Sequence, residues 1–158
     1  DYKYRQNMSN IIVNRKATFE YTIEEKYEAG IVLEGWEVKA IREGKGQLVD
    51  SYVKICNGEV WILGFNVNPM ISASTHVHPD SSRLKKLLMH RREIDRLIGK
   101  VEQKGFSIIA LNLHYSKGRV KAEIALAKGK KIHDKRATER EQEHKKEAAK
   151  VLKQYKRM

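Results

Sequence analysis

The 158-residue sequence predicts a mainly β fold, a small closed barrel with flanking helices, followed by a basic C-terminal tail. Two pairs of apolar, alternating segments each flank a glycine-containing turn, which is the pattern of a β-hairpin. One stretch carries apolar residues at helical spacing, and the apolar pattern ends at Ala127. We therefore expect a flexible N-terminus over 1–13, a barrel over 14–127 and a tail over 128–158. Residues 1–7, before Met8, are interpreted as upstream or non-native sequence.

The first two predicted elements are a short helix and a strand. Thr22 and Glu25 have the spacing of a capping box, and Gly30 suits the position after a helix end, so a helix is expected over 22–29. Residues 35–41 are expected to form a strand, because their apolar side chains alternate and share one face: Trp36, Val38 and Ala40.

Two hairpins and a longer helix complete the predicted barrel. Asn57-Gly58 between 52–56 and 59–67 favours a type I′ turn, and the second hairpin joins 106–115 to 119–127. The helix ends before Gly105 and starts between residues 83 and 90, with one apolar stripe of Leu84, Leu87, Leu88, Ile94, Leu97, Ile98 and Val101. Short strands with glycine turns favour an OB-like barrel, because closure removes exposed sheet edges.

The charge of the chain is strongly positive and unevenly placed. The formal net charge is +12, and residues 128–158 contain twelve Lys/Arg against five Asp/Glu, a net charge of +7. Such an excess indicates a polyanionic partner, nucleic acid above all, although charge that only aids solubility is the alternative. The tail has too few apolar residues to fold alone, but 139–156 is rich in helix formers. We expect it to be disordered alone and helical when bound.

Candidate RNA contacts lie at the expected barrel rim and in the tail. The rim residues, whose cations can meet phosphates, are Asn14, Arg15, Lys16, Lys39, Arg42 and Lys45. Trp36 is either core or a platform for an unpaired base, with core favoured by its face. In the tail, Lys128, Lys130 and Lys131 are expected to bind phosphates while His133 stacks on a base; an ordinary flexible terminus is the alternative.

Enzymatic chemistry finds little support. The single cysteine, Cys56, lies in an apolar run and is interpreted as a buried, inert thiol in a reducing, cytoplasmic compartment. His76 and His78 lack cysteine neighbours, which argues against zinc, and no phosphate-binding loop or activated nucleophile is evident. We expect no catalysis and no cofactor. No apolar run approaches the ~20 residues of a membrane span, so no membrane partner is expected.

Several motifs, taken together and in order, resemble the small protein B family, the SsrA-binding proteins of bacterial trans-translation. The matching segments are Asn14–Lys16, Ile23–Glu25 with Glu28–Gly30, Gly35–Lys39, Asp50–Val53, Pro69–Met70, Ser74–Val77, Arg92–Asp95 and Lys128–Arg136. The resemblance implies an OB-like barrel that binds the tRNA-like domain of transfer-messenger RNA in place of an anticodon stem. It further implies delivery of that RNA, with elongation factor Tu and GTP, to stalled ribosomes.

The resemblance also assigns residues. It implies that Glu28, Leu88 and the basic rim contact the transfer-messenger RNA, with His90 standing where some members carry Asn. It implies that the tail enters the empty mRNA channel of the small subunit as a helix, with His133, Asp134, Lys135 and Arg136 at the decoding centre. A monomer is expected. The rival functions are a general single-stranded RNA-binding barrel and a hydrolytic or metal-dependent enzyme.

Overall fold

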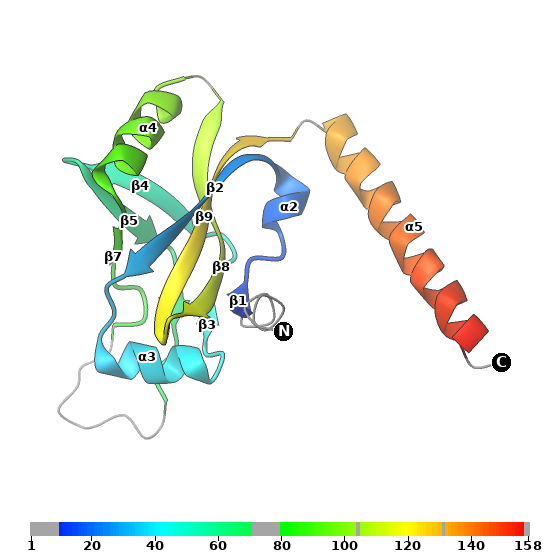
Figure 1. Ribbon diagram of the computed structural model, residues 1–158, viewed down its shortest axis with the longest axis horizontal. Helices are drawn as coiled ribbons and strands as arrows, with labels where there is room; N and C mark the ends of the chain where they lie inside the picture. The colour runs from blue at the N-terminus through cyan, green and yellow to red at the C-terminus, as the bar shows by residue number, and fades with distance from the viewer. Residues whose placement is uncertain (1–9, 71–79, 104, 131, 157–158) are drawn as a thin grey trace.

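The computed structural model describes residues 10–70, 80–103, 105–130 and 132–156 (Figure 1). The strands are β1 (Asn10–Val13), β2 (Tyr21–Ile31), β3 (Gly46–Gln47), β4 (Tyr52–Cys56), β5 (Glu59–Leu63), β6 (Asn66–Val67), β7 (Lys85–Leu88), β8 (Phe106–Ser116) and β9 (Arg119–Gly129). The helices are α2 (Ala17–Glu20), α3 (Gly35–Arg42), α4 (Arg91–Val101) and α5 (Ile132–Lys156). The predicted mainly β architecture with flanking helices is confirmed.

Antiparallel strand pairings build the main sheet. Its order is β1-β8-β4-β5-β7-β2-β9, and β8 also pairs with β9, so the pairings run in a ring from β8 back to β8. The contact between β4 and β8 is the shortest, because only Val53 and Ile108 are in register there. Strands β3 and β6 form a separate pair. The ring encloses a core whose largest fully buried apolar side chains include Phe65, Ile41, Leu48, Ile62 and Leu87.

Both predicted hairpins are confirmed, since their turn residues adopt the required backbone. Asn57 and Gly58 have φ values of 53° and 74°, as a type I′ turn needs. Lys117 and Gly118, at 52° and 75°, join β8 to β9 in the same way. β5 ends at Leu63 rather than at residue 67, and β9 continues to Gly129, two residues beyond the expected barrel end.

The helix predicted over 22–29 is wrong, because these residues lie within strand β2. Partly buried residues alternate with exposed ones along β2, which is the period of a strand. The strand pairs with β9 from Tyr21 to Gly30. Long-range pairing with β9 therefore outweighs the local capping pattern of Thr22 and Glu25.

The strand predicted over 35–41 is also wrong, because these residues form helix α3. Glu34 caps the helix, and its backbone N–H donates to Glu37 Oε1 at 2.7 Å, completing a capping box. The buried residues are Glu37, Ala40 and Ile41, which share one helical face. Trp36 lies one helical turn before Ala40 and is half-buried, with its side chain packed against the edge of the core.

Helix α4 begins at Arg91, after the predicted range of starts, with His90 as its cap. Leu87 and Leu88 belong to strand β7, and Leu84 directly precedes it, so these three do not continue the helical stripe. Burial in β7 alternates, with Lys85 and Leu87 inside. Apolar residues three and four apart, followed by a true helix, produced the mistaken assignment.

Three further features bear on the expectations. Asn10–Val13, expected to be flexible, pair with β8 as strand β1. Cys56, expected to be buried, is exposed at the end of β4, because the hairpin turn follows it immediately. No described helix has the length and apolar character needed to cross a membrane.

Candidate nucleic-acid interface

A hollow of about 480 Å³ brings together three residues predicted to contact RNA. Glu28 enters it from β2, Leu88 from the end of β7 and His90 from the start of α4. A second hollow, of about 300 Å³, shares Leu88 with the first and adds Arg42 from the last turn of α3. We name the two hollows together the Leu88 surface. The residues that line it include Glu28, Gly30, Arg42, Leu88, His90, Lys117, Arg119 and Lys121.

The chemistry of the Leu88 surface suits a folded RNA. Leu88 is 52% exposed, and four cations surround it: Arg42, Lys117, Arg119 and Lys121. Cations bind phosphates, while an exposed apolar side chain packs against a sugar or an unstacked base. Sequence reasoning missed the three cations of the β8–β9 hairpin, although the basic composition around its turn was visible.

Close strand packing at Gly30 shapes the hollow. Gly30 is in register with Leu88 across β2 and β7. A Cβ atom at residue 30 would lie 3.2 Å from the Leu88 Cβ atom, tighter than ordinary packing, so glycine lets the two strands approach. The Leu88 side chain is thereby held against β2 beside Glu28.

Glu28 and His90 each keep polar atoms available at this surface. The Glu28 side chain is 51% exposed, and its Oε1 lies 3.2 Å from His114 Nε2. A carboxylate can accept hydrogen bonds from base amino groups or a ribose 2′-OH. His90 caps α4, with its backbone N–H donating to Glu93 Oε1 at 3.1 Å and its side chain accepting from the first turn.

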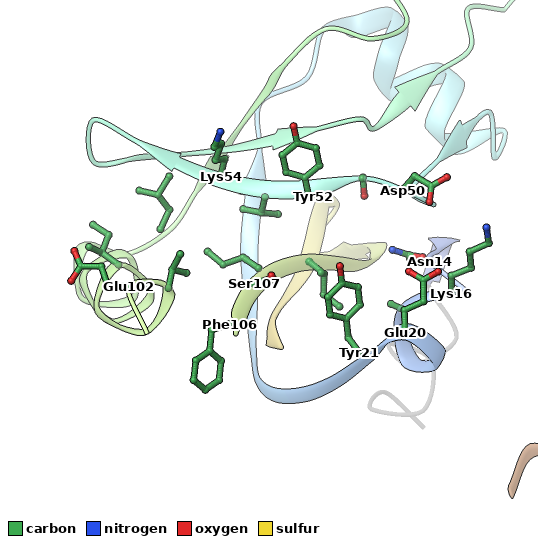
Figure 2. Close-up of a pocket in the computed structure, with 18 of the residues that line it drawn as sticks. Asn14, Lys16, Glu20, Tyr21, Asp50, Tyr52, Lys54, Glu102, Phe106 and Ser107 are labelled. Atoms are coloured by element: carbon green, nitrogen blue, oxygen red, sulfur yellow. The ribbon is translucent and has the colours of Figure 1, made fainter. Parts of the chain in front are cut away.

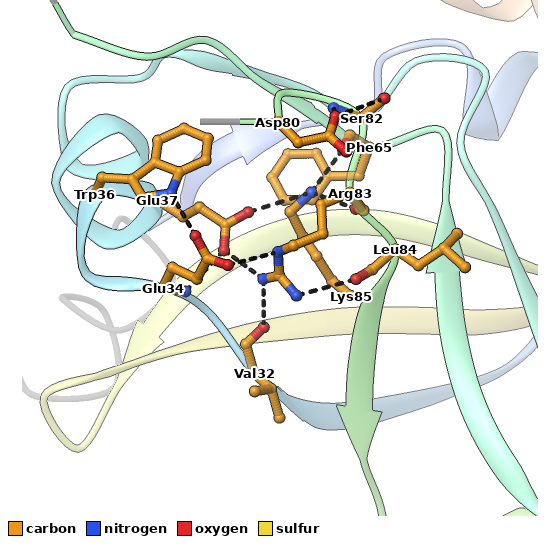
Figure 3. A network of polar contacts seen from close by, with 10 residues as sticks. All are labelled: Val32, Glu34, Trp36, Glu37, Phe65, Asp80, Ser82, Arg83, Leu84 and Lys85. Carbon is orange, nitrogen blue, oxygen red and sulfur yellow. Dashed lines mark hydrogen bonds and ion pairs between the residues drawn. The ribbon is translucent and has the colours of Figure 1, made fainter. Parts of the chain in front are cut away.

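A buried ionic network fixes α3 beside the Leu88 surface (Figure 3). Glu37 is fully buried and accepts a hydrogen bond from Arg83, which also donates to the Val32 carbonyl at 3.3 Å. Lys85, also fully buried, lies 3.6 Å from Glu37 and donates to the carbonyls of Phe65 and Arg83 at 3.0 and 2.9 Å. The network therefore joins α3, β7 and the end of β2.

The network shifts the titration of its cations in opposite directions. Burial lowers the pKa of Lys85, opposed by the charge of Glu37. The hydrogen bond that Arg83 donates to Glu37 raises the pKa of Arg83. At the network's edge, half-buried Trp36 donates from Nε1 to Glu34 Oε2 at 2.6 Å. Its role as an RNA platform stays a prediction.

A larger groove of about 880 Å³ lies where β4 and β8 diverge (Figure 2). Tyr52 and Lys54 lie on one side of this β4–β8 groove, and Tyr21 and Phe106 lie on the other. Lys16 lines one end. The described lining has mixed charge, with carboxylates as well as lysines, so the groove lacks the basic character of the Leu88 surface.

The other rim residues occupy different environments. Asn14 is buried, and its amide donates to the Ala110 carbonyl at 2.9 Å, so this side chain anchors β8. Arg15, Lys39 and Lys45 are exposed. The structure thus brings Arg42 to the Leu88 surface and Lys16 to the β4–β8 groove, and neither hollow includes Arg15, Lys39 or Lys45.

The predicted ribosome contacts begin at the end of β9. Lys128 Nζ lies 4.5 Å from the centre of the Phe106 ring. Lys130 ties the base of α5 to α2, because its backbone N–H and its Nζ each donate at 2.8 Å to the Glu20 and Thr18 carbonyls, respectively. His133, Asp134 and Lys135 lie in the first turns of α5, and Arg136 is exposed. Lys131 lies outside the described residues.

The metal hypothesis gains nothing from the described residues. No cluster of three or more His, Cys, Asp or Glu side chains forms among them. The two histidines on which the hypothesis depended, His76 and His78, lie outside the described ranges.

Comparison with known proteins is consistent across sequence and structure. The family model described as "SmpB protein" matches residues 11–154. The SsrA-binding protein of Burkholderia ambifaria is 57% identical over 143 residues, 90% of this chain and 97% of that protein. The SsrA-binding protein of Acidovorax sp. is 60% identical over 145 residues, 92% of each chain. A chain in the solved structure "tmRNA-SmpB: a journey to the center of the bacterial ribosome" matches with a TM-score of 0.63 and 38% identity, covering 78% of this chain and 87% of that one.

Proposed function

Because this chain belongs to the SmpB protein family, we propose that it binds the tRNA-like domain of transfer-messenger RNA and delivers that RNA to stalled ribosomes in trans-translation. The relatives are named SsrA-binding proteins. The similar solved chain comes from a structure whose name mentions tmRNA-SmpB and the bacterial ribosome. The proposal places the RNA on the Leu88 surface.

The observation that carries the proposal is the assembly of the Leu88 surface from distant segments. Glu28, Arg42, Leu88 and His90 come from four elements or their ends, yet they line two hollows that share Leu88. These residues lie far apart in the sequence, so their convergence on one surface supports the proposal. The surrounding cations supply phosphate contacts, which position a protein on RNA without reading its sequence.

The strand ring supports recognition by shape. We propose that it acts as a closed OB-like barrel, rigid enough to stand in for the missing anticodon stem. Folded RNA offers few readable base edges, so a preformed surface that matches backbone and ribose positions is the effective way to select it.

The tail supplies the second half of the proposed function. Each α5 side chain that is described is exposed, and the helix projects away from the strand ring in Figure 1. We propose that this basic segment enters the mRNA channel of the small subunit only when no message fills it, with 133–136 at the decoding centre. The protein acts in the cytoplasm as a monomer, with elongation factor Tu and GTP in the delivery complex.

A matched pair of leucines tests the RNA surface. Leu84 and Leu88 are 51% and 52% exposed, but only Leu88 lines the two hollows. Binding of the full chain to a transcribed tRNA-like domain is measured for Leu88→Ser and Leu84→Ser. Leu88→Ser should weaken binding by about tenfold, the size of one lost central apolar contact, while Leu84→Ser leaves it unchanged.

Competition decides between this function and a general single-stranded RNA binder. Unstructured RNA of equal length should displace the tRNA-like domain only at large excess. Equal displacement by unstructured RNA, or equal effects of the two leucine substitutions, would overturn the proposal.

A further inference from the structure

We propose that His114 is a positioning residue that holds the Glu28 carboxylate for RNA and couples the strength of RNA binding to protonation of its own ring. This inference rests on the proposed function, because Glu28 is a contact residue only if the Leu88 surface binds RNA. It adds a residue that neither the sequence motifs nor the two hollows identify.

Both ring nitrogens of His114 face hydrogen-bond partners. Nε2 lies 3.2 Å from Glu28 Oε1, and Nδ1 lies 2.9 Å from Asn112 Oδ1. The His114 side chain is 16% exposed, whereas that of Glu28 is 51% exposed. The imidazole is therefore the enclosed partner, and the carboxylate is the partner that extends toward solvent.

The identity of the Asn112 atom facing His114 is fixed by a third residue. Asn112 Nδ2 lies 3.4 Å from Glu123 Oε1, and an ionised carboxylate can only accept. The amide nitrogen of Asn112 must therefore face Glu123, which leaves its oxygen toward His114. Both neighbours of the imidazole are then acceptors. A neutral imidazole has one N–H, so only the protonated ring donates to both.

The charges around His114 are nearly balanced apart from Glu28. Glu123 lies in register with both Glu28 and Asn112, and Lys26 lies 4.0 Å from it. Lys121 is the cross-strand neighbour of His114 and adds a like charge when the ring is protonated. The remaining charged or titratable groups lining the hollow around Glu28 are His90, Glu93 and Lys117. Among the residues that the structure describes, Glu28 is the one whose carboxylate contacts the ring directly.

Protonation of His114 has two effects on the surface that faces RNA. The protonated ring fixes Glu28 through Oε1, leaving the other carboxylate oxygen to accept a hydrogen bond from RNA. It also cancels a negative charge close to the phosphates. The neutral ring has one N–H for two acceptors, so it can donate to Glu28 or to Asn112 but not to both. It also carries no charge to offset the carboxylate of Glu28, which then repels RNA phosphates. Affinity should therefore be higher when the His114 ring is protonated than when it is neutral.

The test measures binding of the full chain to a transcribed tRNA-like domain at pH 5.8 and pH 7.8, at constant ionic strength. Wild type should bind about fivefold more weakly at pH 7.8, the size of a charged pair that is partly exposed. His114→Gln should abolish that ratio. His114→Arg, which stays charged, should bind at pH 7.8 as wild type binds at pH 5.8.

Three other variants separate the effect of His114 from those of His90 and His144 and from effects on folding. His144→Gln, on exposed α5, should behave as wild type, and His90→Gln should lower affinity at both pH values while keeping the ratio. Glu28→Gln changes an exposed side chain, so it should abolish the difference in affinity between the two pH values without disturbing the core. Adding His114→Gln to this variant should cause no further change in affinity at either pH. Thermal unfolding of each variant verifies its fold.

The outcomes distinguish the two levels of the proposal. Binding by wild type with the same pH ratio as His114→Gln would overturn the role of His114 and leave the proposed function standing. Absence of binding to the tRNA-like domain at either pH would overturn the proposed function, and this inference with it.

Discussion

The Leu88 surface and helix α5, the two regions proposed to bind nucleic acid, are built in opposite ways. The Leu88 surface lies on a ring of paired strands. A buried ionic network holds α3 in place, and Gly30 lets β2 pack closely against Leu88 of β7. The described side chains of α5 are exposed and rich in Lys and Glu, and the helix contacts helix α2. One surface is preformed by packing, whereas the other has little packing to define its conformation.

The contrast has a thermodynamic consequence. A preformed surface loses its conformational entropy during folding and not on binding, so less of the free energy of its contacts is offset when RNA binds. A segment with few tertiary contacts is held in place by its partner and loses conformational entropy on binding. The first arrangement suits a permanent RNA partner, and the second suits a reversible test for an empty channel.

Removing the tail gives the largest expected effect. A chain ending at Lys130 keeps the whole of β9 and the anchor of Lys130 on α2. It should bind the tRNA-like domain within about twofold of wild type, because the Leu88 surface is intact, and it should abolish peptide tagging on stalled ribosomes. Tagging in a reconstituted translation system measures the outcome. Tagging at the wild-type level by the shortened chain would refute the division between the two regions.

Breaking the buried network gives the next largest effect, because the network holds α3 against β7 and so supports the Leu88 surface. Glu37→Leu leaves the buried Lys85 without its carboxylate, so we expect a loss of about 3–5 kcal/mol in the free energy of unfolding. Urea denaturation measures it. The double variant Glu37→Leu/Lys85→Met removes both charges and should recover part of the loss. Equal destabilisation in the single and double variants would contradict the coupling.

Sequence reasoning succeeded where structure is set locally and failed where it is set by distant pairing. Asn57 and Gly58 both favour the positive φ of their turn, and Gly118 accepts it in the second, between segments of alternating apolar residues, so both hairpins were predictable. Residues 22–29 carry a plausible capping box, but the partner strand β9 lies about a hundred residues away in the sequence and decides their conformation. In α3 the informative signal was the Glu34–Glu37 box, which the alternation of apolar residues obscured.

The candidate site shows the same limit. Glu28, Leu88 and His90 were selected by family resemblance, and nothing in their local sequence indicates that they meet. Lys117, Arg119 and Lys121 reach the same surface because the β8–β9 hairpin ends beside β2 and β7, which only the assembled sheet reveals. Asn14, selected for the basic rim, is instead buried and bonded to β8.

The salt dependence of binding sharpens the comparison at the level of single charges. Arg42→Gln and Lys121→Gln should each weaken binding of the tRNA-like domain and reduce the slope of log affinity against log salt by about 0.7–0.9, because each removes one of the proposed phosphate contacts. Lys54→Gln, in the β4–β8 groove, is the matched control and should leave the slope unchanged. Slopes that fall equally in all three variants would show that binding depends on net charge and not on the Leu88 surface.

The smallest expected effect concerns the ion pair that joins β2 to α4. Hydrogen bonds from Arg96 and then Tyr27 lower the pKa of Glu25 from 4.5 to about 2. A folded-state pKa below the unfolded value means that the pair stabilises the protein above about pH 4.5 and that this contribution is lost as pH falls toward 2. Because both side chains are partly exposed, the contribution should stay below about 1 kcal/mol. Urea denaturation of wild type and Glu25→Gln should therefore differ at pH 7 and converge near pH 2. A difference that persists at low pH would assign the role of Glu25 to packing in β2, and the position of α4 beside the Leu88 surface would then not depend on this charge.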